Sequence, residues 1–78
     1  MQHRDGSVHF VELAAPDARE VLAALARRIA ARGAVTELLH SADQADLWLL
    51  LVRGEAPPTA DLPGAARTWH FTASGGAP

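Results

Sequence analysis

The side chains best suited to chemistry in this sequence are four histidines and two tryptophans. Imidazole can transfer protons or hold a metal ion, and an indole ring can stack on a flat ligand. His9 and His70 could lie on neighbouring strands, but no histidine belongs to a metal-ligand spacing such as His-x-Glu or His-x3-His. We therefore expect no metal site, and no motif in the sequence indicates a cofactor.

Five residues are candidates for contact with a small ligand: His40, Asp46, Trp48, Trp69 and His70. Each also has a structural interpretation. The two tryptophans could provide buried area in a small core, and the two histidines could lie on solvated surface or line a polar pocket. Asp46 and Asp43 flank a predicted turn, where their carboxylates would do acid–base work only if they were buried. The sequence contains no Ser, His and Asp grouping and no glycine-rich phosphate loop, so we assign no catalytic residue.

The chain length limits how much core the protein can bury. Its 78 residues predict a single domain, with an ordered core over 7–73 and flexible tails over 1–6 and 74–78. A domain of this size buries only roughly 60 to 65% of the surface that its unfolded chain exposes. Because the sequence has no cysteine, disulfides and thiolate zinc sites cannot add stability. Assembly into a homodimer or a higher homo-oligomer is the remaining way to add stability.

The charge pattern argues against nucleic-acid and membrane partners. The formal net charge is -2, and the seven basic residues are all arginines, several of which fall in the last turns of one predicted helix. Direct nucleic-acid binding normally needs a concentrated basic face. The N-terminal MQHRDGS is polar, and the longest apolar run is far below the roughly 18 residues of a membrane span. We expect a cytoplasmic protein without membrane contact.

The predicted elements follow the order β, α, β, β, loop, β. Apolar alternation with β-branched and aromatic residues predicts strands over 7–14, 34–40, 46–53 and 66–73. A helix is predicted over 16–32, because Pro16 suits a first helical position and Gly33 suits a C-terminal stop. GEAPPTADLPG, residues 54–64, contains three prolines and two glycines, so it predicts a loop with at most one helical turn near 59–62.

The longest apolar run, Leu47–Val52, predicts a central strand. Strand side chains alternate, so half of this run points to each face of the sheet and both faces need cover. The first strand is also apolar on both faces, which places these two strands in the centre of a four-stranded antiparallel sheet of ferredoxin-like α+β fold. One helix covers one face, and a second copy should cover the other. We assign Leu50 to the set of side chains that faces the partner, and Leu49, on the opposite face, serves as the control. Alternation alone does not decide which of the two sets faces the partner.

The stretches VTELLHSADQADLWLLLV and LPGAARTWHF resemble the dimeric α/β barrel superfamily, in particular the effector-binding domain of the Lrp/AsnC regulators. Asp46 stands at the Asp of that family's Gly-x-Tyr-Asp turn, and residues 62–64 match its closing Leu-Pro-Gly. Asp43 and Ala45 replace the motif's Gly and Tyr, and the family's second helix is reduced to a proline-rich loop. The resemblance implies a dimer that binds a small-molecule effector or a protein partner. It implies no direct DNA binding, because no helix-turn-helix precedes the domain.

A weaker resemblance, over Ser41–Val52, is to the small cofactor-independent monooxygenases of antibiotic biosynthesis. Their Glu-x-Trp signature is replaced here by residues 53–55, Arg-Gly-Glu. The first expectation is therefore an oligomeric ligand- or partner-binding module without chemistry of its own. The alternative is a monooxygenase or isomerase acting on a small aromatic substrate in a closed cavity lined by Trp48, Trp69 and His70. The loop over 54–64 is expected either to carry specificity or to act as a connector.

Overall fold

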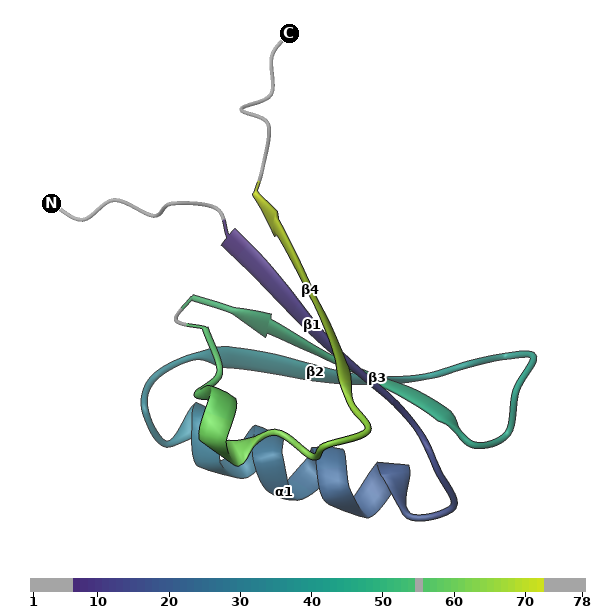
Figure 1. Cartoon of the computed structure of the whole chain (residues 1–78). Helices are drawn as coiled ribbons and strands as arrows, with labels where there is room; N and C mark the ends of the chain where they lie inside the picture. Colours follow the sequence, from purple (N-terminus) through teal and green to yellow (C-terminus); the bar gives the residue numbers. More distant parts are fainter. Residues whose placement is uncertain (1–6, 55, 73–78) are drawn as a thin grey trace, which may run out of the picture.

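The computed structural model describes residues 7–54 and 56–72, which form a four-stranded antiparallel sheet with one helix on one face (Figure 1). The predicted tails, and Ala73 at the end of the predicted core, lie outside the described residues. The elements are β1 (Ser7–Ala14), α1 (Ala18–Ala30), β2 (Val35–His40), β3 (Leu47–Arg53), the short 3₁₀ helix η1 (Thr59–Asp61) and β4 (Arg67–Thr72). The architecture is α+β.

The strand order is β2-β3-β1-β4, with every neighbouring pair antiparallel. This confirms that the first and third strands are central and that the second and fourth form the edges. Strands that are apolar on both faces lose the most by exposure, which explains why β1 and β3 take the inner positions. The order and the single helix are compatible with a ferredoxin-like fold, in which η1 stands where a second helix would lie.

The helix is two residues shorter at each end than predicted. At its start Pro16 and Asp17 form a tight turn, in which the Ala18 N–H donates to the Ala15 carbonyl at 3.0 Å. At its end the N–H of Gly33 donates to the Ala30 carbonyl at 2.9 Å, so the last turn tightens into 3₁₀ geometry. Gly33 then reverses the chain with φ +96°. The cap residues therefore end the helix as expected but lie outside its regular turns.

Replacing Gly33 with alanine is expected to lower the free energy of unfolding by about 1 to 2 kcal/mol, because an L side chain is strained at positive φ. A Cβ added at Gly33 meets nothing within 4 Å, so the cost is conformational and not steric. Gly64→Ala is the matched control, since Gly64 also has open space around it but lacks the positive φ. Urea denaturation of both variants measures the difference, and equal stabilities would contradict the conformational explanation.

The core lies between α1 and one face of the sheet. Its buried residues are Val11, Leu13, Ala18, Leu22, Leu25, Ile29, Leu50 and Val52. The assignment of Leu50 to a partner-facing set was therefore wrong, because Leu50 is fully buried in this core. The side chains on both faces of β3 are apolar, so hydrophobicity alone does not show which face packs on α1. The register with β1 shows it, because Leu50 pairs with Val11 while Leu49 pairs with the charged Glu12.

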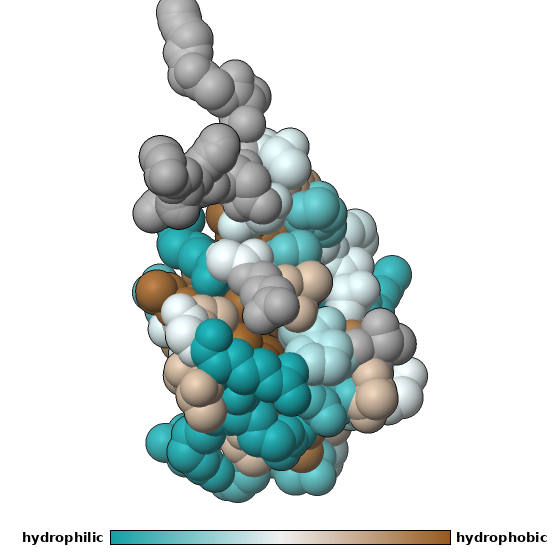
Figure 2. Space-filling model, turned by 90° about the vertical axis from the view of Figure 1, so that its left-hand side faces the viewer, coloured by the Kyte–Doolittle hydropathy of each residue, from teal (hydrophilic) through white to brown (hydrophobic). Residues whose placement is uncertain are grey.

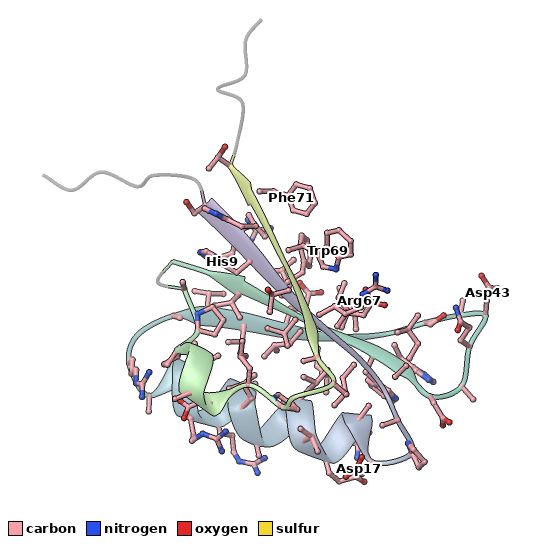
Figure 3. The ribbon with its side chains drawn as sticks, in the orientation of Figure 1. His9, Asp17, Asp43, Arg67, Trp69 and Phe71 are labelled. Atoms are coloured by element: carbon pink, nitrogen blue, oxygen red, sulfur yellow. The ribbon has the colours of Figure 1, made fainter. Side chains whose placement is uncertain are left out.

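The other face of the sheet, called the open face below, has no helix or strand of residues 7–54 and 56–72 packed on it. Its members, which the strand register places on the same side of the sheet, are Val8, Phe10, Glu12 and Ala14 of β1, Val35, Glu37 and Leu39 of β2, Leu47, Leu49, Leu51 and Arg53 of β3, and Arg67, Trp69 and Phe71 of β4. Figure 3 shows Arg67, Trp69 and Phe71 projecting from the same side of β4, away from α1. The open face is mostly apolar.

The segment after β3 lies on the helix side of the sheet. Figure 1 shows η1 beside α1, and an ion pair of 3.8 Å joins Arg32 to Asp61 there. The predicted helical turn near 59–62 is confirmed as η1. Figure 2 views the molecule from this end and shows hydrophilic residues over much of the surface, with small hydrophobic areas between them. This end of the molecule therefore differs in character from the open face.

Candidate functional site

The hairpin end of β2 and β3 holds a stacked aromatic pair. The rings of His40 and Trp48, which are register partners, lie 4.0 Å apart with an interplanar angle of 12°. The Nε2 of His40 lies 2.8 Å from the Ala45 carbonyl oxygen. Because a carbonyl only accepts hydrogen bonds, Nε2 is the donor in this contact. The connection is further fixed by the Ser41 hydroxyl, which accepts the N–H groups of residues 43 and 44 at 3.1 and 3.0 Å.

A hollow of about 300 Å³, called the hairpin hollow below, lies at this end of the sheet. Its lining residues are Glu12, Leu39, His40, Ser41, Leu47, Trp48 and Leu49. Its volume is at the lower end of the range for small-molecule sites. The three leucines belong to the open face, and Glu12 is the charged side chain in the lining. The hairpin hollow therefore combines apolar walls with one carboxylate.

Glu12 is held from the neighbouring strand. The indole Nε1–H of Trp69 donates to its Oε1 at 3.2 Å, although Trp69 itself is not part of the hairpin hollow. Arg67 is the register partner of Glu12 on β4, and its guanidinium carbon lies 5.9 Å from the centroid of the Trp69 ring. This distance is within the range of a cation–π interaction. A carboxylate, an indole and a guanidinium thus lie together on the open face.

A second hollow of about 200 Å³, called the proline-loop hollow below, lies where residues 56–62 approach β1 and β4. Its lining residues are His9, Phe10, Ala56, Pro57, Leu62, Thr68, Trp69 and His70. His9 and His70 are register partners whose rings stack at 4.3 Å with an interplanar angle of 14°. Ring nitrogens direct their lone pairs within the ring plane, so nearly parallel rings do not aim at one ion. Among residues 7–54 and 56–72 no group of three or more possible metal ligands is found.

The five residues predicted to contact a ligand do not form one site. His40 and Trp48 line the hairpin hollow, and Trp69 and His70 line the proline-loop hollow. Trp48 lies on the same face of β3 as the buried Leu50, whereas Trp69 belongs to the open face. The two tryptophans therefore lie on opposite faces of the sheet. Asp46 lines neither hollow. Its backbone carbonyl accepts a hydrogen bond from the Ala15 N–H at 3.0 Å. In a single chain Trp48 therefore does not share a hollow with Trp69 and His70.

Two titratable residues in the linings of these hollows, Glu12 and His9, were not among the predicted ligand contacts. Glu12 could have been found as the one acidic residue of the first strand, SVHFVELA. His9 was considered only for metal binding, and its stacking on His70 depends on the pairing of the first strand with the last. Such long-range pairing is not visible in the local pattern.

Comparison with known proteins gives no family. No protein-family model, curated protein or solved structure matches this chain. The resemblance to Lrp/AsnC effector-binding domains and to small monooxygenases therefore stays a prediction, supported at the level of the α+β architecture and the strand order alone. In the part of the chain that the structure describes, no helix is long and apolar enough to cross a membrane.

Replacing residues 56–61 with a Gly and Ser linker of equal length tests the proline-loop hollow. We expect the fold and the subunit number to persist, because the buried core residues found in the described part of the chain lie outside the replaced segment. Retention of any ligand held by the proline-loop hollow should fall, since the rigid Pro57 wall is removed and a flexible loop costs more entropy to order.

Native mass spectrometry of both forms reports subunit number and retained ligand together. Asp61→Asn is the control, because it removes the partly exposed Arg32–Asp61 ion pair, worth about 0 to 1 kcal/mol, without changing the loop backbone. Unchanged retention in the linker variant would mean that the loop is a connector.

Proposed function

We propose that this chain is a homodimeric module that binds a small molecule and carries out no chemistry of its own, with the open faces of its two copies packed against each other. The observation that carries the proposal is the exposure of large apolar side chains on the open face. In the single chain Val35 is 63% exposed, Phe71 54%, Trp69 45% and Leu39 36%. Burying such side chains stabilises a protein by about 25 cal/mol per Å² of apolar surface. A contiguous apolar face of this kind is typical of an interaction surface.

A second copy suits this surface because the face is electrically self-complementary. It carries two carboxylates, Glu12 and Glu37, and two guanidinium groups, Arg53 and Arg67, so its formal net charge is zero. A face with a large net charge would repel its own copy, whereas a balanced face can place opposite charges across a two-fold axis. The small core also favours assembly, because burial between two sheets adds what a chain of 78 residues lacks.

The binding role rests on the distribution of the functional groups. Glu12 lines one hollow and His70 lines the other, so in a single chain the two residues do not line one cavity as an acid and a base around one substrate. The hairpin hollow is bounded by open-face leucines, which places it at the border of the proposed interface. A second copy packed there would close it against water and would retain a small apolar ligand.

Native mass spectrometry of the protein purified gently from its host tests this proposal. We expect a mass of twice 8.2 kDa with a bound small molecule that is lost on denaturation. A monomer without any adduct would contradict it. Turnover of a small aromatic compound by the purified protein would instead support the cofactor-independent monooxygenase or isomerase.

A further inference from the structure

The lining residues of the hairpin hollow indicate which class of ligand it can bind. Its open-face walls are Leu39, Leu47 and Leu49, and Glu12 is the one acidic residue in its lining. We infer that this hollow binds a small amphiphilic amine, with the ammonium group on Glu12 and the apolar body on the leucines. The inference rests on the proposed binding function and names the ligand class of that site.

The position of Glu12 is fixed before a ligand arrives. Its Oε1 accepts the Trp69 Nε1–H at 3.2 Å, which restrains the side chain without adding a positive charge. A carboxylate has about four lone-pair sites, so one indole donor leaves capacity for an ammonium group on the same carboxylate. Charge-assisted hydrogen bonds of this kind are roughly twice as strong as neutral ones.

The neighbouring arginine, Arg67, does not bind the Glu12 carboxylate in place of a ligand. Arg67 is opposite Glu12 in the register, but its guanidinium lies over the Trp69 ring and Arg67 is not part of the hollow's lining. Within residues 7–54 and 56–72, Glu12 forms no ion pair of 4.0 Å or less. The carboxylate of Glu12, a residue of the hollow's lining, is therefore not paired with a cation of the described chain.

The apolar walls determine the rest of the ligand. A volume of about 300 Å³ accommodates one aromatic ring or a short alkyl chain, but not a polycyclic molecule with polar substituents. A second copy over the open face would lower the local dielectric constant and strengthen the ammonium–carboxylate contact. An anionic ligand of the same shape would meet the carboxylate and be repelled.

Three probes of matched shape and different charge test the inference on the full chain at neutral pH: phenethylamine, phenethyl alcohol and phenylpropionate. Amide chemical-shift perturbation of isotope-labelled protein gives the affinity and the location of binding. We expect phenethylamine to bind at least about tenfold more tightly than phenylpropionate, with shifts in β3 and the 41–46 turn. Equal or tighter binding of the acid, or no binding of the amine, would overturn the inference.

Two variants on the open face locate the charge effect. Glu12→Gln should weaken phenethylamine about tenfold and leave phenethyl alcohol unchanged, because the glutamine oxygen still accepts the indole N–H but carries no charge. Glu37→Gln is the matched control, since Glu37 is a carboxylate of the same face outside the hollow. Equal losses in both variants would show that the effect is non-specific and would overturn the inference.

Sedimentation velocity on the same samples separates the two proposals. A dimer that does not prefer the amine overturns the ligand class and leaves the assembly intact. A monomer that prefers the amine overturns the assembly and keeps the ligand class.

Discussion

Leu50→Glu is expected to abolish folding. Leu50 is fully buried between β3 and α1, and no cationic group belongs to the core that surrounds it. An unpaired charge at such a position costs several kcal/mol, which is comparable to the whole stability of a small domain. Far-UV circular dichroism and urea denaturation of the purified variant should show an unfolded chain.

The adjacent residue provides the control for this prediction. Leu49 is on the open face, so Leu49→Glu should keep the circular dichroism spectrum of the folded protein, with a modest loss of stability because the new carboxylate is the register partner of Glu12. An unfolded Leu49→Glu beside a folded Leu50→Glu would show that the two faces of β3 are reversed.

Phe71→Glu is expected to dissociate the proposed dimer without unfolding the chain. Phe71 is 54% exposed in the single chain and contacts the Phe10 ring edge-on at 5.6 Å, so the fold depends on it little. Large aromatic side chains are enriched among the interface residues that contribute about 2 kcal/mol or more, which predicts a dissociation constant raised by about 30-fold or more.

Analytical ultracentrifugation over a concentration series measures this change. Thr72→Glu is the matched control, because Thr72 is exposed on the same strand but has the opposite parity and lies off the open face. Equal dissociation of both variants would argue that added charge, and not loss of an apolar contact, is responsible.

Local patterns predicted the elements of this fold accurately. Each strand begins or ends within about one residue of its predicted bounds, because turns and glycines at the ends are strong local signals. The central positions of β1 and β3 were also predictable, since both are apolar on both faces. The helix was overestimated, because Pro16 and Gly33 mark the boundary region of a helix and not its first and last regular turns.

The site was less predictable because it depends on register. The hydrogen bond from Trp69 to Glu12 joins residues 57 positions apart, and no local pattern contains that pairing. In the same way, both sets of side chains in LWLLLV are apolar, so the face occupied by Leu50 was decided by its pairing with Val11. Trp48 and Trp69 were grouped by residue type, whereas the sheet places them on opposite faces.

The open face should be covered by a second copy of this chain, and sedimentation equilibrium of the wild-type protein tests this assembly most directly. At micromolar concentration we expect a single species of twice 8.2 kDa that does not dissociate on moderate dilution. A species of 8.2 kDa that persists across the concentration series would contradict the dimer, because the apolar open face would then be stable in water without a partner.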